Sequence, residues 1–176
     1  AETGSEMLLS EEEKLLQSTV REFADQVLAP AAAACDQSGE FPWHNVRQLA
    51  ELGLFGLTVD EEYGGGGGTT RQLVVAVEEI ARGCGSTSVI YIAHLSLCTQ
   101  FIVTFGTDSQ KERYLKKLAS GEWLGAFSLS EPQAGSDASN LKTVAEKKDD
   151  HYLLKGTKNW VTSGINSDVV IVFAMP

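Results

Sequence analysis

The residues most suggestive of a binding site lie where a short apolar run changes into a polar turn. The stretch LGAFSLSEPQAGSD, residues 124–137, begins with the alternation of a strand and continues into an acidic residue, a proline, a glycine and serines. A second stretch, NWVTSG at residues 159–164, sets a tryptophan beside a threonine and a serine. Taken alone, the first stretch is an ordinary turn and the second an ordinary tryptophan of a core or sheet. Their joint occurrence raises the question of which ligand needs both.

Several other chemistries are excluded by spacing. The glycine run at residues 64–68 is not followed by Gly-Lys-Ser/Thr, so it is not a phosphate-binding loop, and we expect a flexible linker there. His44, His94 and His151 are scattered without the spacing of a zinc site, so we expect no metal. A Gly-x-Ser-x-Gly motif is missing from the sequence, which leaves a hydrolase without an obvious nucleophile.

The net charge and the cysteines limit which partners the protein can bind and in which cellular compartment we expect it. The 176 residues carry a formal net charge of -10, which repels nucleic acid and anionic lipid, so we expect no nucleic-acid partner. Cys35, Cys84 and Cys98 are widely spaced among apolar neighbours and are predicted to be buried, reduced thiols. The N-terminus, AETGSEMLLSEEE, lacks a basic region, so we expect no targeting leader. A bacterial cytoplasm or a mitochondrial matrix fits these features.

Helical periodicity runs through the first two thirds of the chain. Ser10 with Glu13 three residues later forms a capping box, and Pro30 ends or bends the helix that starts there. Gly53 suits a left-handed cap for the next helix. The predicted helices cover about residues 10–30, 42–52, 70–82, 86–105 and 108–119.

The helix predicted at residues 86–105 has no charged residue, which makes a membrane span conceivable. Against a span stand its many polar residues, among them Ser88, His94 and Gln100. We therefore expect no membrane span and a central helix that is buried on all sides by its neighbours.

From residue 123 the pattern changes to short apolar or alternating runs. Strands are predicted within residues 123–130, 142–150, 151–158, 159–164 and 168–176. Asp149 and Asp150 mark a hairpin turn. Helices followed by strands indicate an α+β fold, with an all-α domain at residues 1–122 and the first part of an antiparallel β domain at residues 123–176.

Two motifs carry a family resemblance. FSLSEPQAGSD at residues 127–137, followed by LKGTKNWVTSG at residues 154–164, resembles the acyl-CoA dehydrogenase flavoproteins. EEYGGGG, EEIARGCGSTS and FGTDSQKERYLKKLASGEWLGAF also look like that family's N-terminal helical domain, so the resemblance covers nearly the whole chain. Short-chain and branched-chain members look closest. The resemblance implies an FAD-dependent oxidoreductase of fatty acid metabolism that introduces a double bond into an acyl-CoA thioester in β-oxidation.

The resemblance also assigns residues to the FAD ring. It implies that Phe127, Leu129 and Ser130 line the flavin edge, that Trp160 packs against the ring, and that Thr162 hydrogen-bonds near flavin N5. This set suits a planar aromatic cofactor with polar edges, which needs an apolar face and hydrogen-bonding groups. Ser136 is implied to contact the acyl-CoA. One departure is Gln133, where many relatives have glycine.

Four residues of the helix at 86–105 are implied to line the acyl-chain pocket. These residues, spaced to share one face, are Val89, Ile90, Ala93 and Leu97. Each of them could equally pack the core. If they line the pocket, the bulk of Ile90 favours short or branched acyl groups.

In the family the catalytic base is a Glu of a C-terminal helical domain, which this sequence does not contain, so no residue here is assigned as the base. The implied partners are the acyl-CoA substrate, an electron-transferring flavoprotein as acceptor, and either further copies in a homotetramer or the missing C-terminal half. Two alternatives stay open. One is an acyl-CoA oxidase or flavin monooxygenase of the same superfamily, and the other is a non-catalytic binding or assembly subunit.

Overall fold

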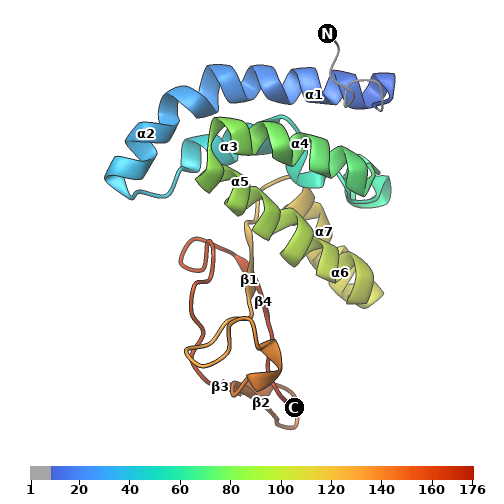
Figure 1. Ribbon diagram of the computed structural model, residues 1–176. Helices are drawn as coiled ribbons and strands as arrows, with labels where there is room; N and C mark the ends of the chain where they lie inside the picture. The colour runs from blue at the N-terminus through green and yellow to red at the C-terminus, as the bar shows by residue number, and fades with distance from the viewer. Residues whose placement is uncertain (1–8) are drawn as a thin grey trace.

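A computed structural model describes residues 9–176. The expectation that the N-terminus carries no targeting leader rests partly on residues 1–8, which lie outside the described residues. Figure 1 shows helices gathered at one end of the molecule and the strands at the other, with the C-terminus beside β2 and β3. The α+β class predicted from the sequence is confirmed.

Helices occupy the chain up to residue 119. They are α1 (Glu11–Phe23), the π-helical turn η2 (Ala24–Leu28), α2 (Ala29–Ser38), α3 (Trp43–Glu51), the 3-10 turns η3 (Leu54–Gly56) and η4 (Glu61–Tyr63), α4 (Thr70–Gly83), α5 (Gly85–Ile92), the π-helical turn η5 (Ala93–Thr99), α6 (Gln100–Phe105) and α7 (Asp108–Ala119). The strands are β1 (Gly125–Ser128), β2 (Val144–Lys147), β3 (Tyr152–Lys155) and β4 (Val169–Val172), with a 3-10 turn η6 (Ala138–Asn140) between β1 and β2.

The start of α1 is set by the predicted capping box. The Ser10 hydroxyl accepts from the Glu13 N–H at 3.2 Å, and the Ser10 N–H donates to the Glu13 carboxylate at 2.8 Å. Pro30 lies in the first turn of α2 and does not end the helical run, but the run bends between α1 and α2, which is the other outcome predicted for this proline (Figure 1). The run passes through η2 and ends where Gly39 adopts a φ of 65°.

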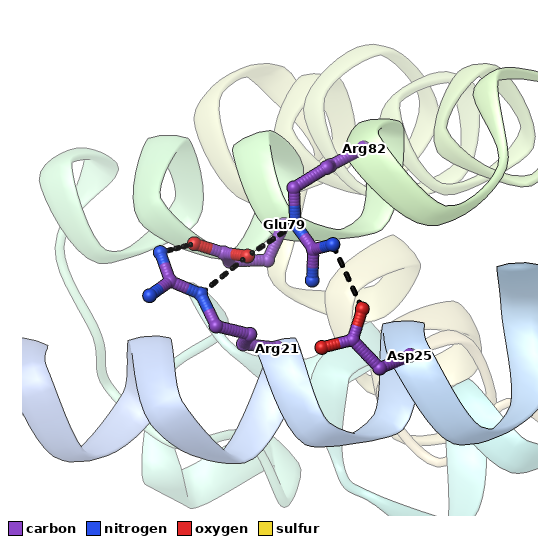
Figure 2. A network of polar contacts seen from close by, with 4 residues as sticks. All are labelled: Arg21, Asp25, Glu79 and Arg82. Carbon is purple, nitrogen blue, oxygen red and sulfur yellow. Dashed lines mark hydrogen bonds and ion pairs between the residues drawn. The ribbon is translucent and has the colours of Figure 1, made fainter.

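Four charged side chains join α1 and η2 to α4, as Figure 2 shows. Arg21 donates two hydrogen bonds to the carboxylate of the buried Glu79, at 2.6 and 3.1 Å. Arg82 donates to Glu79 at 3.1 Å and to Asp25 at 2.8 Å. The hydrogen bonds from Arg21 lower the pKa of Glu79 against the opposing effect of burial. These contacts keep Glu79, the buried carboxylate of α4, ionised and paired with two arginines.

The long apolar helix runs from Gly85 to Phe105 through α5, η5 and α6. The prediction that it is buried on all sides is wrong, because Val89 and Phe105 are exposed while Tyr91 and Leu95 are fully buried. Its length and composition alone would allow it to cross a membrane, but half of its apolar window is buried inside the protein. In Figure 1 it lies between α4 and the strands, at the edge of the helical layer that faces β1.

The glycine run at residues 64–68 is not the flexible linker that its composition predicts. The N–H of Gly66 donates to Gly56 O at 2.9 Å, and that of Gly68 donates to Leu57 O at 2.7 Å. A Cβ on Gly65 would lie 2.0 Å from the carbonyl oxygen of Val59. Glycine is required here because two backbone segments approach more closely than any side chain permits.

The strands form two small sheets of different types. β2 and β3 pair in antiparallel register around the predicted turn at Asp149 and Asp150. β1 and β4 pair in parallel, with Phe127 opposite Ile171. The prediction of an all-antiparallel β domain is therefore wrong. The predicted strand at residues 159–164 is also wrong, since this segment forms no strand: Trp160 and Ser163 have positive φ, and a turn begins at Thr162.

His94 connects the helical layer to β1. Its Nδ1 accepts from the Gly125 N–H at 2.9 Å, so its Nε2 carries the proton that is donated to Leu118 O at 3.1 Å. The ring stacks on Phe55 at a centroid distance of 4.2 Å. Burial lowers the pKa of His94 to about 4, against the opposing effect of the Leu118 carbonyl, and so keeps the ring neutral.

Candidate functional site

The site is built around the end of β1. The side chain of Phe127, in β1, packs in a three-ring cluster with Phe101 of α6 and Phe173, at centroid distances of 5.4 and 5.2 Å. Phe101 and Phe173 lie 5.6 Å apart edge to face, so all three rings contact one another. This cluster fixes β1 against both α6 and the residue after β4.

The Trp160 segment, residues 157–164, lies against the end of β1. The Asn159 N–H donates to Ser130 O at 2.9 Å, and the Lys158 ammonium donates to Leu129 O at 2.9 Å. The structure therefore brings Trp160 close to Leu129 and Ser130, although 30 residues separate Ser130 from Trp160 in the sequence.

Trp160 has a conformation that its own packing does not explain. Its φ is 58°, in the left-handed region that few residues other than glycine adopt, and its side chain is 92% exposed. Backbone strain clusters at ligand-binding sites, so this conformation makes Trp160 a candidate binding residue. The plain interpretation of Trp160 as an ordinary core residue is wrong.

Residues with hydroxyl groups lie near Trp160 along the backbone. Thr162 and Ser130 are half-buried, and in the part of the chain described here neither side-chain hydroxyl has a hydrogen-bond partner. Ser163, also at positive φ, is buried. Ser136 is exposed in the turn that follows Gly135. An exposed indole in a segment that also carries hydroxyl groups can receive a flat aromatic ligand with a polar edge.

Glu131 and Lys158 form a buried ion pair under this surface, with N–O distance 2.8 Å and side chains only 2% and 11% exposed. Burial alone would raise the pKa of Glu131, but the Lys158 ammonium and the N–H groups of Lys142 and Thr143 hold it well below its usual value. Sequence reasoning missed both residues. The sequence did offer a signal for the pair: the first motif carries the acidic Glu131 and the second the basic Lys158, each close to apolar residues.

The four residues expected to line an acyl-chain pocket have different environments. Ile90 and Ala93 are buried, and Ile90 belongs to the hydrophobic core. Val89 is 52% exposed and Leu97 is half-buried. The π-helical turn η5 begins at Ala93, so the regular helical spacing behind the single-face prediction does not hold from that residue onward.

Two family models match this chain, one over its helical part and one over its strands. The acyl-CoA dehydrogenase N-terminal domain matches residues 10–122, and the acyl-CoA dehydrogenase middle domain matches residues 126–176. The chain belongs to the acyl-CoA dehydrogenase family. The family resemblance carried by the two motifs is thereby confirmed.

Curated acyl-CoA dehydrogenases give the same result. The chain is 42% identical to the short-chain-specific acyl-CoA dehydrogenase of Clostridium acetobutylicum, over 95% of this chain and 44% of that protein. It is 47% identical to the mitochondrial isovaleryl-CoA dehydrogenase of Bos taurus, over 94% of this chain and 39% of that protein. The chain thus spans less than half the length of these relatives.

Solved acyl-CoA dehydrogenase structures superpose closely. Butyryl-CoA dehydrogenase from Megasphaera elsdenii matches with a TM-score of 0.89 at 38% identity, over 95% of this chain and 45% of that chain. A glutaryl-CoA dehydrogenase from Mycobacterium smegmatis, in complex with FADH2, matches with a TM-score of 0.92 at 30% identity, over 97% of this chain and 44% of that chain.

The potential metal ligands of the described residues are dispersed. Within residues 9–176 no three His, Cys, Asp or Glu side chains are grouped so that they could hold a metal ion. Cys84 and Cys98 are buried free thiols, as predicted, while Cys35 is only half-buried. Burial raises the pKa of Cys98 to about 11, which favours the protonated thiol near neutral pH.

Proposed function

We propose that this chain supplies the helical domain, residues 1–122, and the first strands of the middle domain, residues 123–176, of an FAD-dependent acyl-CoA dehydrogenase. Relatives named for short-chain, isovaleryl- and butyryl-CoA substrates support a short or branched acyl group. The buried Ile90 and the half-buried Leu97 are the residues that we propose limit acyl length, with Val89 and Ala93 beside them.

The observation that carries this proposal is the exposed indole of Trp160, held at positive φ in a segment whose backbone is bonded to the end of β1 at Ser130. These residues fit an isoalloxazine ring, which needs an aromatic or apolar face and hydrogen-bonding groups at its edge. Trp160 would contact the ring, Thr162 and Ser130 would bond its polar edge, and Phe127 and Leu129 would support the wall. Ser136 would contact the acyl-CoA. A relative in complex with FADH2 supports the choice of cofactor.

When bound, FAD would supply the acceptor for the hydride that leaves the β-carbon of the thioester. The residues of this chain orient the two reactants and exclude water from one side of the ring. Removal of the α-proton requires a carboxylate base, and we assign that role to no residue of this chain.

We also propose partners and a compartment. A solved structure described as the electron transferring flavoprotein of Acidaminococcus fermentans holds a chain that matches this one with a TM-score of 0.91, which supports such a flavoprotein as electron acceptor. Buried free thiols at Cys84 and Cys98 support a reducing compartment, either a bacterial cytoplasm or a mitochondrial matrix. A homotetramer is the oligomeric state that we propose.

Binding of FAD is the first test. Titration of the protein with FAD, followed by flavin fluorescence and by the shift in melting temperature, should give a saturable site. Trp160→Ala should weaken binding at least about tenfold because it removes the stacking surface. Trp43→Ala, which removes a partly exposed indole from the helical domain, is the matched control and should bind FAD normally. Equal affinity of both variants would contradict the assignment of Trp160.

Turnover is the second test. Anaerobic addition of butyryl-CoA or isovaleryl-CoA to the FAD-loaded protein, assembled with the helical domain that carries the proposed carboxylate base, should bleach the flavin absorbance, whereas a long-chain thioester should not. Bleaching followed by rapid recovery and peroxide formation in air would favour an oxidase instead. Stable FAD binding with no bleaching by any acyl-CoA would favour a non-catalytic binding subunit.

A further inference from the structure

We propose that the buried Glu131–Lys158 ion pair is a positioning device that holds the Trp160 segment in its binding conformation before the cofactor arrives. The role of this device in cofactor binding rests on the proposed FAD site. The positioning of the Trp160 segment is a property of this chain without the cofactor. Neither residue touches the proposed ring. Both act through the backbone of the residues that do.

The Glu131 carboxylate collects donors from three separate segments. One oxygen accepts from Lys158 Nζ at 2.8 Å and from the Thr143 N–H at 3.0 Å. The other accepts from the Lys142 N–H at 2.7 Å and from the Gln133 side chain at 2.6 Å. The turn after β1, the approach to β2 and the Trp160 segment therefore meet at one buried charge.

Lys158 completes the connection to β1. Besides Glu131, its ammonium donates to Leu129 O at 2.9 Å, and the adjacent Asn159 N–H donates to Ser130 O at 2.9 Å. Within residues 9–176, these are the hydrogen bonds that tie residues 157–160 to the rest of the protein. Trp160 itself is 92% exposed and at positive φ, so packing of its own side chain does not hold it in place.

A buried ion pair is poor evidence for a stabilising role, because the loss of hydration of both ions offsets most of their attraction. The pair Glu146–Lys155, on the β2–β3 hairpin, is solvent-exposed and joins only neighbouring strands. What distinguishes Glu131–Lys158 is its geometry, since it sets where residue 158 lies relative to the end of β1. Positioned donors of this kind lower the cost of ordering a loop when a ligand binds.

The test begins with FAD-free protein and uses amide hydrogen exchange, resolved by NMR. In the wild type, the Asn159 amide should be protected by its bond to Ser130. Glu131→Gln and Lys158→Met should each raise its exchange rate at least about tenfold, because a charge-assisted network is lost. The Leu95 amide in the core reports global opening and should not change in proportion. Glu146→Gln is the matched control and should leave Asn159 protected.

A double variant separates positioning from folding. Removing one buried charge can unfold a domain, whereas Glu131→Gln combined with Lys158→Met removes both charges and avoids an unpaired ion. Its circular dichroism and melting temperature should be near those of the wild type, while its Asn159 amide exchanges fast. Its dissociation constant for FAD should rise at least about tenfold, and that of Glu146→Gln should not.

Each outcome decides the proposal. Retained protection of Asn159 in the folded double variant would overturn it, as would fast exchange at Asn159 with unchanged FAD affinity. If the wild type binds no FAD at all, the proposed function fails, yet the exchange rates still establish or refute the positioning role. Faster exchange at Leu95 to the same degree as at Asn159 would assign the pair to global stability and refute positioning.

Discussion

The neutral, buried His94 makes a strong prediction about the dependence of stability on pH. Burial lowers the pKa of His94 from 6.5 to about 4 in the folded protein. Its ring contacts are the Phe55 ring, the Leu118 carbonyl and the Gly125 N–H, and none of these can balance a positive charge on both nitrogens. The unfolded chain therefore binds a proton at a higher pH than the folded chain does.

The sign and size of the effect follow from linkage. Above pH 6.5 both states are neutral at His94, so the histidine contributes no pH dependence. As the pH falls from 6.5 toward 4, only the unfolded state takes up the proton, and the free energy of unfolding decreases. Between about pH 7.5 and about pH 5 the loss amounts to about 2 kcal/mol, and it reaches about 3 kcal/mol once both states are protonated.

Urea unfolding at several pH values measures this directly. The wild type should lose about 2 kcal/mol over the interval, and His94→Gln should lose much less, although it is less stable at neutral pH. His151→Gln, which removes an exposed imidazole from the β2–β3 hairpin, is the matched control. A His94→Gln variant with the same pH slope as the wild type would refute the reasoning, because the slope would then arise elsewhere.

Two further predictions concern contacts within the helical layer. Glu79→Gln should lower the free energy of unfolding by about 2 kcal/mol in urea titrations, because it weakens three charge-assisted hydrogen bonds to a buried carboxylate, whereas Asp25→Asn at the exposed end of the same network should change it far less. Equal effects of the two substitutions would show that burial of Glu79 is immaterial. Gly65→Ala should cost about 1–3 kcal/mol in thermal or urea unfolding through the clash of its Cβ with a carbonyl oxygen, while Gly85→Ala, where a Cβ meets nothing within 4 Å, should be nearly neutral. Tolerance of alanine at Gly65 would show that the loop is as pliable as its composition suggests.

Local signals in the sequence were sufficient for much of the secondary structure. The capping box of Ser10 and Glu13, the left-handed Gly53 and the turn at Asp149 and Asp150 all depend on groups within four residues of one another. Groups that lie this close in the sequence can meet whatever the rest of the chain does, so sequence patterns report their interactions. The two motifs also sufficed to identify the family, which the domain matches confirm.

The arrangement of the site depends on contacts that no local pattern contains. β1 and β4 pair in parallel although about 40 residues separate them, and Glu131 meets Lys158 across 27 residues. The backbone of Gly65 lies against Val59 so closely that no side chain would fit there. A glycine run of the same composition without this contact would be flexible. Local patterns were enough to predict the helices and the hairpin, whereas the residues of the proposed flavin wall were assigned through the family resemblance and stay a prediction. That a buried ion pair holds this wall together could be seen only in the folded chain, because burial and pairing across 27 residues are not properties of any one segment.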